Sequence, residues 1–145
     1  SLAIWKEDER FAGSLDFEVI EEDGTSTEGG EIKAPQRGYR LLIDFCEARK
    51  RNYYSPGRNR CGWERNMDHI YQTHYDQMIA NGIITDKKRM HYVVQDKESK
   101  TTYCDIIPVS EEYWRKELYA PICKILDNEI EPLMKRHHIV RLSVL

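Results

Sequence analysis

The first 35 residues limit the possible folds most, because three strand-like segments follow one another with turn residues between them. These segments are residues 2–5, "LAIW", residues 11–22, "FAGSLDFEVIEE", and residues 31–35, "EIKAP". β-Branched and aromatic residues favour strands, and the glycines between the second and third segments favour a tight turn. Pro35 ends the third segment, because proline cannot donate to a strand ladder. This pattern predicts an antiparallel meander.

Helices are predicted by apolar residues at helical spacing over residues 38–50 and 64–80. The Asn-Gly pair at 81–82 is typical of a helix C-cap and should end the second of them. A longer helix is expected to begin near Ser110 and to run to about His137. Its two prolines, at 121 and 132, should kink or divide it.

Two further strands are expected at residues 89–96 and 101–109, separated by a polar turn. The order of elements therefore predicts an α/β fold with a central mixed sheet flanked by helices. A length of 145 residues with 40% hydrophobic content is enough for one domain with a real core. We expect a single domain over residues 1–145.

Composition excludes several classes of protein. A net charge of −3 argues against a generic polyanion binder, so any nucleic-acid surface must come from local clustering of basic residues. The apolar runs are far shorter than the ~20 residues that span a bilayer, and no signal peptide opens the chain. We therefore expect an intracellular protein that does not enter a membrane. The cysteines form no C-x-x-C pair, which favours free thiols over a zinc ribbon. An iron–sulfur cluster held by distant cysteines is the alternative.

Asp16 is unusual, because it lies inside an otherwise apolar strand-like segment. On the next segment Glu31 and Lys33 share one strand face, while Ile32 points to the other. One interpretation is a sheet with a solvated acidic face. The other places Asp16 beside Glu31 on neighbouring strands.

Two adjacent carboxylates repel each other unless a cation binds between them. Mg²⁺ prefers oxygen ligands and retains several waters, so Asp16 and Glu31 with a backbone carbonyl form a reasonable site. Lys33, on the same face, could then stabilise the charge that develops on a phosphate during its hydrolysis.

Asp16 followed by the triplet Glu31-Ile32-Lys33 resembles the PD-(D/E)XK nuclease superfamily. Within it, the first 35 residues look like the core of the lambda-exonuclease family of YqaJ-type viral recombinases. The segment "HIYQTHYDQMIANG" is similar to the family's glutamine-containing helix, and "RMHYVVQDKESKTTYCDIIPVSEEYW" to the strands and helix that close its fold. The similarity covers roughly residues 2–130, and it implies a restriction-endonuclease-like core.

The resemblance also implies roles for single residues. Asp16 and Glu31 become metal ligands, Ile32 lends its backbone carbonyl, and Lys33 orients or activates water. Gln72 lies near the family glutamine, with Tyr75 or Gln77 as alternatives. The chain starts without the upstream helix that supplies a further metal-binding acid in relatives. Either it is a trimmed core, or a partner chain or a reduced mechanism fills the gap.

A basic segment lies between the two middle helices, "RKRNYYSPGRNR" at residues 49–60. Basic side chains bind phosphates and exposed aromatic rings stack on unpaired bases. The segment either contacts nucleic acid or is a solvated connector. Its candidate nucleic-acid-binding residues are Arg49, Lys50, Arg51, Tyr53, Tyr54, Arg58 and Arg60.

Together these features predict a Mg²⁺-dependent deoxyribonuclease in which Mn²⁺ can substitute, an exonuclease of viral or phage DNA recombination or processing. A structure-specific or RNA-cutting endonuclease of the same superfamily is one alternative. A catalytically idle nucleic-acid-binding module is another. DNA is the expected partner, with further copies of the chain or a single-strand-annealing protein as additional partners.

Overall fold

The computed structural model describes residues 2–34, 72–95 and 102–140. The helix expected over residues 38–50 and the basic segment after it lie outside these ranges. So does the first part of the helix expected over residues 64–80.

The chain divides into two compact units, residues 1–111 and 112–145, and each is described by itself. None of the helices in the described ranges is long and apolar enough to cross a membrane.

A small two-stranded sheet holds the N-terminal residues. Strand β1, Ala3–Ile4, pairs antiparallel with β2, Ala12–Gly13. Beside it the Trp5 N–H donates to the Phe11 carbonyl over 2.9 Å. The two rings meet edge to face with their centroids 6.0 Å apart, and both side chains are buried. The hairpin therefore has an apolar contact of its own.

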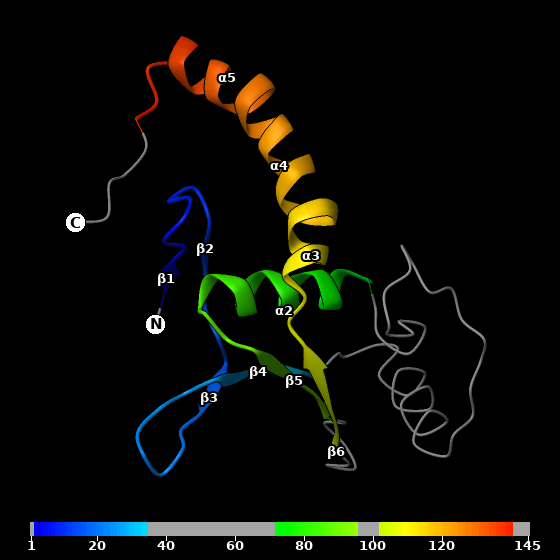
Figure 1. Cartoon of the computed structure of the whole chain (residues 1–145). Coiled ribbons are helices and arrows are strands. Elements are labelled where there is room, and N and C mark those ends of the chain that lie inside the picture. The colour runs from blue at the N-terminus through cyan, green and yellow to red at the C-terminus, as the bar shows by residue number, and fades with distance from the viewer. Residues whose placement is uncertain (1, 35–71, 96–101, 141–145) are drawn as a thin grey trace. The chain divides into compact units, whose positions relative to one another are not determined.

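A four-stranded mixed sheet forms the centre of the first unit (Figure 1). Its strands, in spatial order, are β3, Phe17–Val19, β4, Glu28–Lys33, β5, Arg89–Gln95, and β6, Thr102–Pro108. The outer pairs are antiparallel, whereas β4 and β5 run parallel. The predicted α/β fold with a central mixed sheet is thus confirmed.

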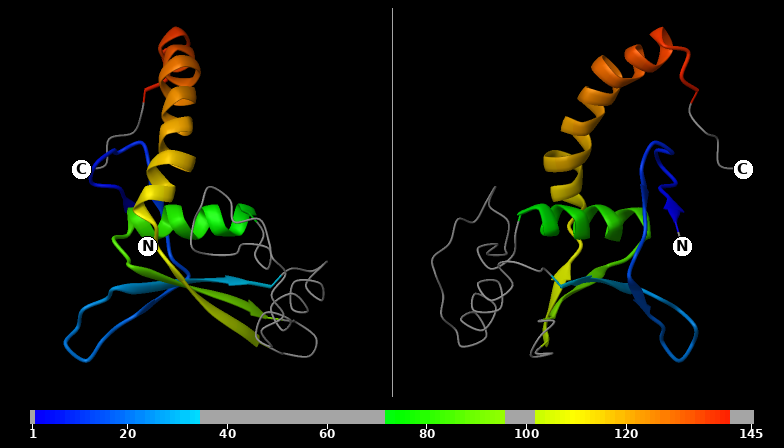
Figure 2. Two further views of the ribbon diagram at one scale, coloured as in Figure 1. Left: turned by 45° about the vertical axis from the view of Figure 1, so that its right-hand side comes forward. Right: turned by 180° about the vertical axis from the view of Figure 1, so that it is seen from behind.

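Helix α2, Gln72–Ile84, lies across one face of this sheet (Figures 1 and 2). Strand β5 alternates, so that Met90, Tyr92 and Val94 are fully buried. Met78 and Ile79 of α2 are fully buried as well. Each such side chain contributes roughly 2 kcal/mol through burial, so this layer fixes the position of α2 over the strands.

The prediction of one continuous strand over residues 11–22 is wrong. β2 ends at Gly13 and β3 begins at Phe17, so the segment between them belongs to neither sheet. Within it the carboxylate of Asp16 accepts a backbone N–H of β4 instead of continuing a regular strand. Aspartate favours such local bonds to the backbone over regular strands. The expected meander therefore splits into the small sheet and the β3–β4 hairpin.

The Asn81-Gly82 pair does not cap α2, as the sequence predicted, but lies inside it. Gly82 is needed there for close packing, because a Cβ would lie 2.5 Å from a methyl carbon of Val109. The chain turns after Ile84 instead, where Asp86 adopts a φ of 57°. The Lys87 N–H then donates to the Gly82 carbonyl over 2.7 Å and closes the helix end.

The second unit is built on one long helical run, which begins in the first unit at Glu111 and ends at Arg136 (Figure 1). Its α-helical parts are α3, Glu111–Tyr113, α4, Ala120–Ile125, and α5, Glu131–Arg136; the π-helical turns η2, Trp114–Tyr119, and η3, Leu126–Ile130, lie between them. A proline stands in the first turn of both α4 and α5. The expected division at the two prolines is confirmed, because each follows a π-helical turn.

Candidate functional site

Asp16 lies beside Glu31, directly before the β3–β4 pairing begins. Phe17 pairs with Gly30 in this antiparallel hairpin, so Asp16 and Glu31 each adjoin the last pair of the ladder. The Asp16 N–H donates to the Gly30 carbonyl over 3.1 Å, and the Asp16 Oδ2 accepts the Ile32 N–H over 2.7 Å. These two bonds hold the Asp16 side chain against β4, close enough for its charge to act on Glu31.

Glu31 is a buried carboxylate, with 3% of its surface exposed. Its pKa is raised above the usual range, mainly by burial and further by the nearby charge of Asp16. A hydrogen bond from Asn81 and the ammonium of Lys33 act in the opposite direction. The site therefore holds two carboxylates close together, and the negative charge of the buried one, Glu31, is disfavoured there.

Lys33 points to the same side of β4 as Glu31. Its Nζ donates a hydrogen bond to Gln77 Oε1 over 2.5 Å. Gln77 belongs to α2, so this bond joins the helix to the strand. The sequence predicted Gln72 as the catalytic glutamine of the site, with Tyr75 or Gln77 as alternatives. Gln72 begins α2, and its side chain lies outside what the structure describes.

His74 and Asn81 were not predicted as part of the site. The Asn81 Nδ2 donates to Glu31 Oε1 over 2.8 Å, and His74 Nδ1 lies 3.0 Å from the Tyr92 hydroxyl. The pKa of His74 is lowered by burial and then by the charge of Lys33. With Gln77 they occupy positions i, i+3 and i+7 of α2, so one polar helix face lies over β4 and β5. This spacing can be read from the sequence, but Asn81 was interpreted as a helix cap and was therefore not considered for the site.

The donor set fits a hard divalent cation. No group of three or more His, Cys, Asp and Glu side chains suited to a metal occurs in the described part of the chain. Two carboxylates with a backbone carbonyl are nevertheless a usual protein contribution to Mg²⁺, which retains several waters. The repulsion that raises the pKa of Glu31 is also what a cation would relieve. Asp16, Glu31 and the Ile32 carbonyl therefore form a chemically consistent site.

The remaining sequence candidates divide between described and undescribed residues. The seven basic and tyrosine residues proposed to bind nucleic acid lie outside the described ranges, as do Cys46 and Cys61.

Cys104 and Cys123 are free thiols, as expected. Burial raises the pKa of Cys104, and the charge of Asp105 raises it further. This thiol is therefore a poor nucleophile at neutral pH.

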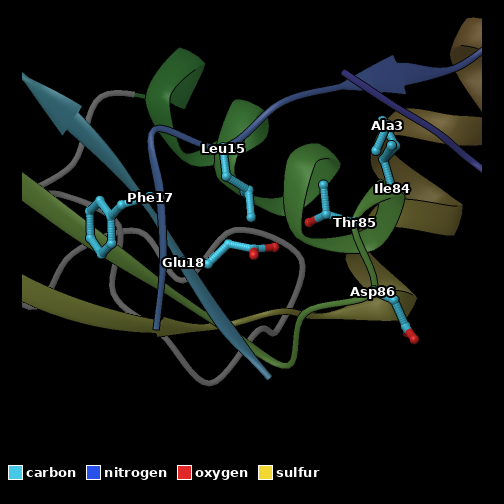
Figure 3. A pocket seen from close by; sticks show the side chains of 7 residues that line it. All are labelled: Ala3, Leu15, Phe17, Glu18, Ile84, Thr85 and Asp86. Carbon is cyan, nitrogen blue, oxygen red and sulfur yellow. The ribbon is translucent and has the colours of Figure 1, made fainter. Parts of the chain in front are cut away.

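A pocket of about 380 Å³ lies beside the β3–β4 hairpin (Figure 3). It is lined by Ala3, Leu15, Phe17, Glu18, Ile84, Thr85 and Asp86. Figure 3 shows the side chains of Leu15, Glu18 and Thr85 between those of Phe17 and Asp86. None of these seven residues is basic, and two are acidic. The pocket therefore does not offer the positive charge that a phosphate would need.

Comparison of this chain with known proteins finds matches among solved structures. No family model matches the chain, and no curated protein does. Two similar solved structures are crystal structures of LHK-Exo, an alkaline exonuclease from Laribacter hongkongensis, one of them in complex with dAMP. The TM-score is 0.54 for the dAMP complex and 0.55 for the other, at 18% and 17% sequence identity.

Each match covers 95% of this chain and 60% of the LHK-Exo chain. The chain thus spans less than two thirds of the protein that it resembles. At this level of identity the likeness shows the fold alone, which is the restriction-endonuclease-like α/β core expected from the sequence.

Proposed function

We propose that this chain is a Mg²⁺-dependent nuclease of the PD-(D/E)XK superfamily that hydrolyses phosphodiester bonds in DNA, most like the lambda-exonuclease family. The observation that carries the proposal is the placement of the Asp16 carboxylate against β4, where it acts on Glu31, with Lys33 on the same strand face as Glu31. The fold shared with an alkaline exonuclease supports it.

In the proposed mechanism, a water oxygen forms a bond to phosphorus while the bond from phosphorus to the leaving ester oxygen breaks. The water gives up one proton, and the leaving oxygen takes up one proton to become a hydroxyl group. Lys33 donates hydrogen bonds to the phosphate oxygens on which negative charge builds. Gln77 holds the Lys33 ammonium over β4. Because Gln77 is a neutral amide, it restricts the lysine without cancelling the positive charge that the reaction uses.

Asp16, Glu31 and the backbone carbonyl of Ile32 are the proposed ligands of Mg²⁺, and Mn²⁺ is expected to substitute. When bound, the cation supplies Lewis acidity and offsets charge on the reacting phosphate. The Ile32 N–H fixes the Asp16 carboxylate, so this ligand is oriented by the strand itself.

DNA is the proposed partner, and the basic segment at residues 49–60 is its proposed contact. One of the two LHK-Exo structures contains dAMP, which supports nucleotide binding by this fold. The proposal extends to exonuclease action in viral or phage DNA recombination inside a host cell. Further copies of this chain or a single-strand-annealing protein are the additional partners we expect.

An assay with end-labelled linear DNA and closed circular DNA, with and without Mg²⁺, tests this function. We expect mononucleotides from linear DNA only, and only with the cation. Asp16→Asn should abolish cleavage, because it keeps an oxygen acceptor for the Ile32 N–H but removes the charge. Asp23→Asn is the matched control, since Asp23 bonds within the β3–β4 turn.

The other outcomes of this assay identify the alternatives. Cleavage of circles or of RNA would make the chain an endonuclease instead. DNA binding without any cleavage would make it a catalytically idle binding module.

A further inference from the structure

Asn81 is a buried polar side chain to which the proposed chemistry gives no role. It is 9% exposed and lies one helical turn from the fully buried Met78. Asparagine is a weak helix former, since its side chain competes for backbone hydrogen bonds. Neither helix propensity nor apolar packing therefore explains an asparagine at this position of α2.

The amide of Asn81 is committed to Glu31. Its Nδ2 donates to Glu31 Oε1 over 2.8 Å, across 50 positions of the sequence. A carboxylate has about four lone-pair sites, so one such bond orients the group and leaves the others for a ligand. The donor is neutral, and it therefore orients Glu31 without neutralising the charge that a cation would bind.

The neighbouring strand leaves room for this side chain. A Cβ at Gly13 would lie 2.5 Å from Asn81 Oδ1, closer than carbon and oxygen approach without a bond. Gly13 ends β2, so the small N-terminal sheet borders the asparagine on the side away from its donor group. Two segments far apart in the sequence thus restrict the rotamer of Asn81.

We propose that Asn81 is a positioning residue that orients the Glu31 carboxylate for a divalent cation, in the site on which the proposed function rests. Outer hydrogen-bond partners of metal ligands typically affect metal affinity or activity by 10–100-fold. Asn81 does not touch the reacting atoms and acts through Glu31 alone.

Calorimetric titration of Mn²⁺ into folded protein tests the proposal, beside cleavage of linear DNA. Asn81→Leu removes the donor at similar volume, and Asn81→Ala does so if the leucine variant fails to fold. We expect Mn²⁺ affinity to fall by about 10–100-fold. Thr85→Val is the matched control, because it removes a hydrogen bond of 2.6 Å to the Asn81 carbonyl without touching the Asn81 side chain. Its Mn²⁺ affinity should equal that of the unmodified protein.

Unchanged Mn²⁺ affinity in a folded Asn81 variant would overturn this inference. A loss of Mn²⁺ affinity in Thr85→Val equal to that in the Asn81 variant would overturn it as well, because it would indicate a general weakening of the helix end. An unmodified protein that binds no Mn²⁺ would overturn both this inference and the metal-dependent function. An unmodified protein that binds Mn²⁺ but leaves DNA intact would overturn the nuclease function alone, and the Asn81 affinities would still decide the positioning role.

Discussion

Glu31 shows how the proposed function and stability pull in opposite directions at a single residue. Its carboxylate is buried beside Asp16, and its pKa is raised by that burial and by that neighbour. A raised pKa means that the folded state holds the proton more tightly than the unfolded state. The contribution to stability is therefore complete below the usual glutamate pKa and is lost as the pH rises through the folded value.

Glu31→Gln should make the metal-free protein more stable at neutral pH, by roughly 1 kcal/mol. Glutamine keeps an oxygen acceptor for Asn81 and carries no charge to bury. The loss of stability with rising pH should also disappear in this variant. Urea unfolding between pH 4 and pH 8, without divalent cations, measures both effects. A variant less stable than the unmodified protein throughout this range would contradict the expectation.

Lys33→Ala should reduce cleavage by roughly 100-fold or more, because it removes an electrostatic interaction that forms in the transition state. The melting temperature should hardly change, since Lys33 is partly exposed. Lys88→Ala, which removes an exposed lysine beside β5, is the control and should keep full activity. A large loss of stability with normal activity per folded molecule would assign Lys33 a structural role.

At the scale of elements, the sequence predicted types better than boundaries. Strands β5 and β6 were both predicted, as two strand-like segments around a polar turn, and their bounds differ from the expected ones by a residue or so. The break between β2 and β3 was not predictable from pattern, because it depends on a bond from Asp16 to a strand sixteen residues away. The end of α2 was missed for a similar reason, since the tight contact of Gly82 with Val109 is a tertiary one.

The same distinction applies to the candidate site. Asp16, Glu31 and Lys33 could be identified from residue type and strand alternation, and the structure brings them together. Their roles in metal binding and catalysis stay predictions. Gln77 was only an alternative and Asn81 was missed, because helix–strand docking decides which face of α2 lies over β4.

Gly82→Ala should destabilise the protein by about 1–3 kcal/mol, although alanine is the better helix former. The added methyl group would meet Val109 and Met90, both packed against this turn of α2. Adding Val109→Ala to the variant should restore part of the stability, since it removes the carbons in the way. Urea unfolding of the two variants measures this, and a stabilising single substitution would show that the packing relaxes freely.

At the scale of the whole molecule, charge is unevenly distributed along an acidic chain. The net charge is −3, yet residues 49–60 contain five basic residues and no acid. Long-range repulsion between the chain and DNA must therefore be offset locally if DNA binds at all. The dependence of binding on salt concentration reports how many phosphates are contacted.

Replacing Arg49, Lys50 and Arg51 with alanine should lower the log–log salt slope of duplex binding by about 0.9 for each phosphate that the protein no longer neutralises. The rate at saturating DNA should stay within a few-fold, because these residues are expected to bind rather than react. Lys124, Lys135 and Arg136, changed together, give a control with the same change in net charge. Equal slopes in the two triple variants would reduce the segment to a solvated connector.

The parallel pairing of β4 with β5 has an evolutionary consequence. The two strands are neighbours in the sheet, although residues 34–88 separate them in the chain. The entropy of closing such a connection grows only with the logarithm of its length, so doubling it costs about 0.6 kcal/mol. Glu31 and Lys33 lie on β4, before this connection. Backbone pairing with β3 and β5 holds β4 in the sheet. A descendant of such a chain can therefore gain length in the part of the connection that precedes α2 at little entropic cost, while it keeps the carboxylate pair and the bonds from α2 to Glu31 and Lys33.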